Sequence, residues 1–139
     1  MGHHATVGLI GMAGSRVVAC LGRPTSAVRS GSRQRWRYGK GLVLRLTKSR
    51  VTSVTVRSRK YAGAHGIGYG TALARMRKAL GRTAFDRRAG AWRAVIRLSS
   101  SRYANIQVRS ARNKVTRVDV TLVSARSLDS LGRRLAAKR

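Results

Sequence analysis

The fold is decided by residues 41–57, GLVLRLTKSRVTSVTVR, where two apolar and β-branched segments are separated by a short polar link. Val54 and Val56 alternate with polar neighbours, which is the pattern of a strand with one buried face. The link, Lys48 and Ser49, is too short for a helical crossover, so the two segments are predicted to form an antiparallel hairpin. We expect the polar, arginine-bearing face of this hairpin to be wet.

Strand patterns of the same kind occur before this hairpin and again in the second half of the chain. The expected strands are Arg35 to Tyr38, Gly41 to Thr47, Arg50 to Arg57, Trp92 to Leu98, Tyr103 to Arg109 and Lys114 to Leu122. The link at 111–113 is also short, so the second half is predicted to contain another antiparallel hairpin.

The chain uses one pattern twice. An offset of 59 residues aligns Gly11 with Gly70, and it also aligns Gly22 with Gly81. Apolar residues spaced by three and four precede both Gly22 and Gly81, which is helical spacing. Glycine can take the left-handed conformation that ends a helix, so both glycines are predicted helix ends. A duplication explains this correspondence better than chance does.

The fold class predicted from these patterns is α+β. It consists of two repeats of a short helix followed by antiparallel strands, at residues 1–60 and 61–123, and a basic C-terminal helix or tail at 124–139. In the last segment Leu128, Leu131 and Leu135 form an apolar stripe, which we expect to dock on the sheet. A basic helix lying on a membrane surface is the alternative, but the stripe has no aromatic anchor.

The charge balance limits the functions open to this chain. The 139 residues contain 31 Lys and Arg against three acids, all of them aspartate, for a formal charge of +28. Most side-chain catalysis needs a carboxylate, a metal-ligand cluster or a base-activated nucleophile, so we expect no enzyme and no catalytic residues. The 42% hydrophobic content is enough for a packed core. Such a basic surface attracts polyanions, although an arginine-biased composition alone would also produce it.

Neither a metal nor a cofactor is expected. The single cysteine, Cys20, and the three histidines make a poor metal set. Gly66, Gly68 and Gly70 precede an expected helix, and such a turn can hold phosphate, but the lysine of a P-loop is absent. We therefore interpret the glycines as the turn that starts a helix. No stretch approaches the roughly 20 apolar residues of a membrane span.

The N-terminus allows two interpretations. Val17 to Cys20 has the small-residue form of a lipoprotein cleavage site, which would make residues 1–19 a signal. However, the start of the chain lacks positive charge, and Arg16 interrupts the apolar segment that a signal requires. The preferred interpretation is that this segment is the first helix of the fold.

Several short motifs together resemble the SmpA/OmlA (BamE-like) domain. They are Ile10-Gly11-Met12, Leu21-Gly22-Arg23-Pro24-Thr25, Arg35-Trp36-Arg37-Tyr38, Leu42-Val43-Leu44-Arg45-Leu46 and Arg50-Val51-Thr52-Ser53-Val54. The resemblance covers residues 8 to 57, and residues 66 to 122 only as a degraded second copy. The doubled form is similar to β-lactamase-inhibitor-like architecture and to arginine-rich secreted proteins of actinobacteria.

This resemblance implies a non-enzymatic module, found outside the cytoplasm, that binds other proteins. It carries over no binding site, since the matched residues make turns and core. From the alternation of the strands we expect outward-facing arginines to hold an acidic protein or an anionic envelope polymer. The candidate binding residues are Arg35, Arg37, Arg45, Arg57, Arg97, Arg109 and Arg117.

A cytoplasmic, nonspecific nucleic-acid-binding protein is the rival hypothesis, in which the same arginines would contact phosphates. Trp36 and Trp92 lie among arginines, as stacking platforms on basic sheets do. The alternation of the strands by itself also places tryptophan in the core and arginine in solvent. We favour that interpretation because no nucleic-acid-binding signature is present.

Overall fold

The computed structural model describes residues 6–58, 61 and 67–136. Its helices are α1 (Thr6–Leu9), α2 (Gly14–Leu21), α3 (Leu73–Leu80) and α4 (Ser130–Ala136), with a 3-10 turn η2 at Ala125–Ser127. Its strands are β1 (Ser26–Ser30), β2 (Arg33–Tyr38), β3 (Leu42–Thr47), β4 (Arg50–Val56), β5 (Ala84–Asp86), β6 (Ala91–Arg97), β7 (Arg102–Ala111) and β8 (Lys114–Ser124).

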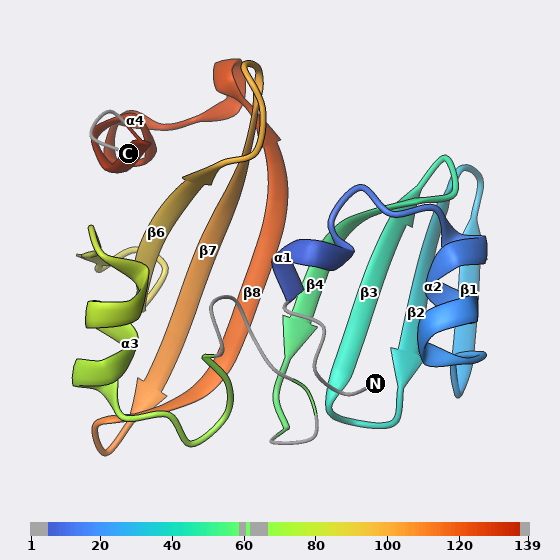
Figure 1. The fold of residues 1–139 in the computed structure, drawn as a ribbon, viewed down its shortest axis with the longest axis horizontal. Helices are drawn as coiled ribbons and strands as arrows, with labels where there is room; N and C mark the ends of the chain where they lie inside the picture. The colour runs from blue at the N-terminus through green and yellow to red at the C-terminus, as the bar shows by residue number, and fades with distance from the viewer. Residues whose placement is uncertain (1–5, 59–60, 62–66, 137–139) are drawn as a thin grey trace.

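The strands form one continuous antiparallel sheet in the order β1-β2-β3-β4-β8-β7-β6-β5 (Figure 1). The two halves of the chain meet at its centre, where Val54 of β4 pairs with Val120 of β8 and Val56 pairs with Val118. The predicted α+β class and antiparallel pairing are confirmed. The sequence-based boundary near residue 60 therefore lies between two segments that share a sheet.

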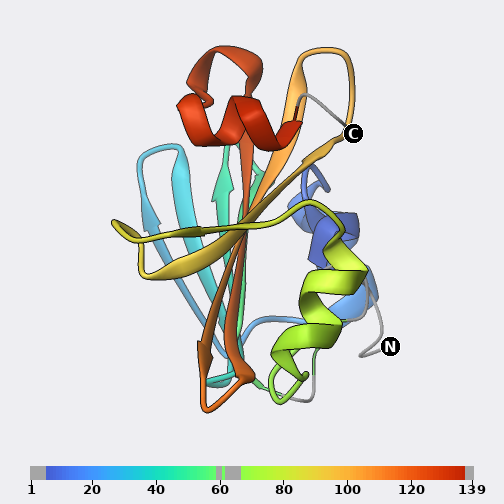
Figure 2. The ribbon, with the colours of Figure 1, turned by 90° about the vertical axis from the view of Figure 1, so that its left-hand side faces the viewer.

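One face of the sheet carries the main core. In β3, Leu42, Leu44 and Leu46 are buried, whereas Arg45 between them is exposed on the opposite face. Helices α2 and α3 cover the apolar face and lie on the same side of the sheet (Figure 2). Their buried residues, Val17 and Met76 among them, pack on it. Full burial of each such side chain contributes about 1.5–3 kcal/mol.

Both covering helices end at a glycine, as predicted. Gly22 has φ +81° and Gly81 has φ +74°, and both follow the last helical residue. The Tyr38 hydroxyl donates a hydrogen bond of 2.9 Å to the Gly22 carbonyl, which ties the end of α2 to β2. Burial raises the pKa of Tyr38 above its ordinary value of 10.0, with a smaller contribution from the charge of Tyr61.

The two halves attach their helices to the sheet through matching backbone hydrogen bonds. Before α2, the Gly11 N–H donates to the Val51 carbonyl over 2.8 Å. Before α3, the Gly70 N–H donates to the Val115 carbonyl over 2.7 Å. The hairpin turns that follow β3 and β7 also match, because each has two consecutive non-glycine residues with positive φ, at 48–49 and 112–113.

The C-terminal helix packs on the other face of the sheet. Leu128 and Leu135 contact Val95 of β6 in a small second core. Docking of the leucine stripe on the sheet is therefore confirmed. The helix itself is shorter than the predicted segment 124–139, because β8 continues to Ser124 and a 3-10 turn follows it.

Two edge strands were not expected from the sequence. All five residues of β1 are exposed, so this strand has no buried apolar face to produce alternation. Strand β5 has only three residues. The segment from Val17 to Cys20 lies within α2, and Val17 is completely buried, in agreement with the helix interpretation.

Candidate functional site

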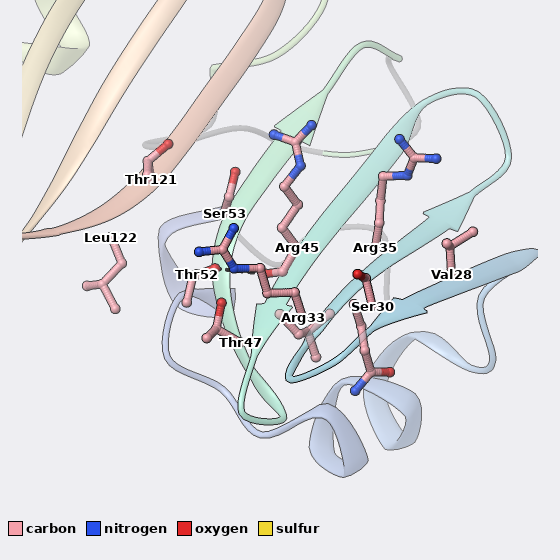
Figure 3. A pocket seen from close by; sticks show the side chains of 12 residues that line it. Val28, Ser30, Arg33, Arg35, Arg45, Thr47, Thr52, Ser53, Thr121 and Leu122 are labelled. Carbon is pink, nitrogen blue, oxygen red and sulfur yellow. Dashed lines mark hydrogen bonds between the residues drawn. The ribbon is translucent and has the colours of Figure 1, made fainter.

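The uncovered face of the first four strands carries a groove. The strand register places Val28, Arg35, Arg45, Ser53 and Thr121 in one row across β1, β2, β3, β4 and β8. In Figure 3 the side chains of Arg35 and Arg45 extend from neighbouring strands, with Ser53 and Thr121 beyond Arg45. The alternation of β2 and β3 places these groups here, because their buried neighbours point to the helices.

The groove has a volume of about 690 Å³. Its polar side chains are three arginines and five hydroxyl groups, namely Arg33, Arg35, Arg45, Ser30, Thr47, Thr52, Ser53 and Thr121. The three guanidinium groups are donors only, and the hydroxyls can donate or accept. The groove therefore offers positive charge and many hydrogen bonds, but no carboxylate.

A second hollow of about 290 Å³ adjoins the groove and shares Arg35 and Arg45 with it. Its cationic lining is Arg35, Arg37, Lys40, Arg45, Arg57 and Arg117. Val43 and Thr55 complete part of its floor. Like charges this close repel one another, and an anion bound among them would relieve that repulsion. We refer to the groove and this hollow together as the basic face.

The three acids of the chain all pair with arginines, but none pairs with an arginine of the groove. Asp119 binds Arg117 at 2.8 Å and accepts a hydrogen bond of 2.6 Å from Thr55. Asp86 and Asp129 both bind Arg93. Among the described residues, no carboxylate pairs with Arg35, Arg37 or Arg45. The positive charge of these three arginines is thus left for a ligand or for solvent, whereas Arg117 at the edge of the hollow is paired with Asp119.

Arg93 shows what the fold does with an arginine that it buries. Its guanidinium makes a bidentate contact with Asp129, at 2.7 and 3.1 Å, and a longer contact of 3.3 Å with Asp86. The Asn105 side chain accepts a further hydrogen bond of 2.9 Å. The hydrogen bonds that Arg93 donates to Asp129 are the largest cause that raises the pKa of Arg93, and burial opposes them.

The carboxylate side of this pair also fixes the start of α4. Asp129 accepts the Gly132 N–H at 2.7 Å, as a residue preceding a helix does. The guanidinium of Arg93 is the main cause that lowers the pKa of Asp129 below its ordinary value of 3.8. The ion pair between Asp129 and Arg93 was not predicted from the sequence.

Five of the seven predicted binding residues come together in the structure. Arg35, Arg37, Arg45, Arg57 and Arg117 line one hollow. Of these five, Arg117 forms an ion pair with Asp119.

The other two predicted arginines lie outside the lining of both hollows. Arg109 pairs in register with Arg117 but does not line either of them. Arg97 lies at the end of β6 and donates to the Ser99 carbonyl at 3.2 Å. Arg33 and Lys40 were missed, although Arg33 continues the alternation of Arg35 in β2 and could have been found from it.

The two tryptophans lie on the helix side of the sheet, as the preferred interpretation predicted. Trp36 packs against the main core, and its indole N–H donates to Gln34 at 3.0 Å. Trp92 also packs against this core, with the Arg77 guanidinium 4.3 Å from its ring centroid. The basic face and the tryptophans are therefore on opposite sides of the sheet, so the stacking platform of the rival hypothesis does not form on the basic face.

The other candidates for chemistry have structural roles. The Gly68 N–H donates to Thr71, and the Gly70 N–H donates to Val115, so neither is directed at a phosphate. Gly66 lies outside the described residues. No cluster of metal-ligating side chains occurs in the described part of the chain. Across residues 6–58, 61 and 67–136, no helix has the length and apolar character needed to cross a bilayer.

Comparison with solved structures places the fold among parts of extracellular bacterial proteins. One match is an extracellular protein containing an SCP domain from Bacillus anthracis, with a TM-score of 0.62 and 9% identity over 94% of this chain. Another is a cysteine-rich secretory protein from Staphylococcus aureus, with a TM-score of 0.59 and 13% identity over 85% of this chain. The matches cover 54% and 46% of those proteins, so this chain spans about half their length.

No family model and no curated protein matches the sequence. The resemblance to the SmpA/OmlA (BamE-like) domain is therefore wrong, since the structural likeness is to the two extracellular proteins instead. The motifs misled for a physical reason. Gly22 ends a helix, and Leu44 and Val54 fill a hairpin core, so any unit that leads from a helix into a hairpin can show the same pattern.

Proposed function

We propose that this chain is a non-enzymatic binding module of an extracellular protein, and that its basic face holds an anionic partner such as an acidic protein or an envelope polymer. One observation carries the proposal. Arg35, Arg37 and Arg45 are exposed side by side on an uncovered sheet face, and no acid of the chain pairs with any of them.

The chemistry of the basic face suits anions held by several weak contacts. A guanidinium group donates parallel hydrogen bonds to a carboxylate or a phosphate, and such charge-assisted bonds are stronger than neutral ones. The hydroxyl groups of the groove add contacts that do not depend on charge. Exposed ion pairs are individually worth about 0–1 kcal/mol, so binding requires several of them at once.

An extracellular location belongs to the same proposal. Both solved proteins described above are secreted or extracellular by description, and their likeness to this chain shows the fold alone. An exported module would meet anionic envelope components, whereas a cytoplasmic one would meet nucleic acid. The tryptophans on the opposite side of the sheet remove the feature that favoured nucleic acid.

We also infer that the two halves of the chain, 1–60 and 61–123, are copies of one unit. Support comes from the matching helix starts, from the hairpin turns at 48–49 and 112–113, and from the central pairing of β4 with β8. In that pairing Val54 and Val118 are equivalent, and so are Val56 and Val120. Two copies of a strand that pair about a two-fold axis give this register.

The test is equilibrium binding to poly-L-glutamate, polygalacturonate and duplex DNA across a salt series. It compares wild type with two triple variants that lose the same charge. The variant of the basic face is Arg35→Gln with Arg37→Gln and Arg45→Gln. The control is Arg97→Gln with Arg102→Gln and Arg126→Gln, which are all exposed and line neither the groove nor the hollow. We expect the first to weaken polyanion binding at least about tenfold and the control less than about twofold.

Equal losses in the two triple variants would contradict the proposal, because the attraction would then follow net charge and not position. Binding to DNA that is selective and survives near-physiological salt would favour the nucleic-acid hypothesis instead. Circular dichroism of all three proteins checks that the sheet is intact in each.

A further inference from the structure

The register of the sheet gives Arg37 and Arg93 equivalent positions. Arg93 follows Trp92, which pairs with Val108 of β7. Arg37 follows Trp36, which pairs with Leu44 of β3. A tryptophan-arginine pair thus occupies the same place beside the hairpin in each half of the sheet.

The two hairpins themselves correspond residue by residue. The register of β3 with β4 shifts between Arg45 and Leu46, and that of β7 with β8 shifts between Arg109 and Ser110. In both hairpins a threonine hydroxyl donates a hydrogen bond of 3.3 Å to the carbonyl of the arginine at this irregularity. The pairs are Thr52 with Arg45 and Thr116 with Arg109. Arg45 and Arg109 at these irregularities are 64 residues apart, and so are Leu44 and Val108, which pair with Trp36 and Trp92. The equivalence of Arg37 and Arg93 therefore follows from strand pairing and does not depend on sequence similarity.

The equivalent arginines differ in what they contact. Arg93 is 5% exposed, because α4 covers it and supplies the bidentate carboxylate of Asp129. Arg37 is exposed and lines the hollow of about 290 Å³ together with Lys40 and Arg57. Within the described residues, no carboxylate contacts Arg37. The second half is thus complete, whereas the first half has the receiving group without its acid.

We propose that Arg37 receives an aspartate or glutamate carboxylate from a partner protein, in the way that Arg93 receives Asp129. This inference rests on the proposed function and specifies its ligand as an acidic polypeptide segment. In the equivalent place the fold holds a carboxylate that belongs to a polypeptide, that of Asp129. Val43 on the floor of the hollow provides an apolar contact for such a segment.

A second copy of this chain is a poor occupant. It carries a formal charge of +28, and all three of its acids are already paired. Two such molecules repel each other at ordinary ionic strength. The acidic segment must therefore come from a different protein.

The experiment is a double-mutant cycle with a defined probe peptide. The probe is SLDSLGEELA, which is Ser127–Ala136 with Arg133 and Arg134 replaced by glutamate, and a second peptide has asparagine in place of its aspartate. Both are titrated into wild type, Arg37→Gln and the control Arg29→Gln, an exposed arginine of the neighbouring strand β1. Poly-L-glutamate is titrated in parallel with the triple variants described above.

We expect the asparagine peptide to bind wild type about tenfold more weakly than the aspartate peptide, as loss of a hydrogen-bonded charge pair implies. The difference should fall below about twofold in Arg37→Gln and stay near tenfold in Arg29→Gln. Such coupling identifies Arg37 as the receiver of the carboxylate and excludes displacement of α4 from Arg93 as the cause.

Equal losses for the asparagine peptide in wild type and Arg37→Gln would overturn the inference. The proposed function would still stand if poly-L-glutamate binding is lost in the triple variant of the basic face. Arg37-dependent binding of polygalacturonate or DNA, with no binding of the peptide, would also overturn it, because the ligand would then not be a polypeptide. If wild type itself bound none of the polyanions, the proposed function would be refuted as well.

Discussion

The contact between Arg93 and Asp129 is expected to hold the C-terminal helix on the sheet, and Asp129→Asn tests this directly. Asparagine keeps the oxygen that accepts the Gly132 N–H, so the start of α4 is preserved. The substitution removes only the negative charge that faces the buried guanidinium. Arg93 then keeps the neutral oxygen of Asn105 and the longer contact with Asp86.

The size of the effect follows from the exposure of the two partners. Removing one member of a fully buried ion pair costs about 3–5 kcal/mol. The cost here is smaller, because the side chain of Asp129 is 59% exposed and Asp86 remains 3.3 Å from Arg93. We expect the free energy of unfolding to fall by about 1.5–2 kcal/mol, the lower part of the range of about 1.5–3 kcal/mol for a hydrogen bond to a charged group. Tm should fall by about 3–8 °C.

Urea unfolding followed by circular dichroism measures this change at neutral pH. The substitution also raises the net charge by one, and Ser100→Lys, at an exposed position in the loop after β6, is the matched control for that effect. The control should change stability by less than about 0.5 kcal/mol. A loss of less than about 0.5 kcal/mol in Asp129→Asn itself would show that the carboxylate does not stabilise the docked helix.

Three further outcomes follow from the structure. The free energy of unfolding should fall as pH drops below about 4. The pKa of Asp129 is lowered in the folded state, so its stabilising contribution is present above that pH and is lost when the carboxylate is protonated. Urea titrations should therefore show a smaller loss of stability at acid pH in Asp129→Asn than in wild type. Gly22→Ala should cost about 1–2 kcal/mol, because φ is +81°, whereas Gly8→Ala, with no positive φ, should cost little; equal effects in urea would refute the assignment. Gly14→Ala should cost about 1–3 kcal/mol in the same assay, since its Cβ would lie 3.0 Å from Trp36; an unchanged midpoint would contradict that close packing.

Much of the fold could be predicted because it is governed by local alternation. Val54 and Val56 alternate with polar neighbours, and that pattern placed the hairpin and its buried face correctly. The glycines at the helix ends were equally informative, since Gly22 and Gly81 both have positive φ. The edge strand β1 could not be predicted, because its residues are all exposed and only pairing with β2 fixes their conformation.

The candidate site could be predicted only in part. Alternation showed that Arg35, Arg37 and Arg45 face solvent, but it could not show which distant arginines would join them. The pairing of β4 with β8 brings Arg117 to the same hollow, and this pairing joins segments that are far apart in the sequence. The burial of Arg93 was also invisible, because it depends on the helix that docks over it.

The most direct test of the central claim is a nuclear magnetic resonance titration with poly-L-glutamate that follows the backbone amides and the arginine side-chain N–H groups. Binding on the basic face predicts that chemical-shift changes concentrate on β2 and β3 and on their exposed arginines, including Arg37 and Arg45. The signals of residues on the helix side of the sheet should not change. Small shifts spread over arginines on both sides of the sheet would contradict the account, since the charge would then act without a site.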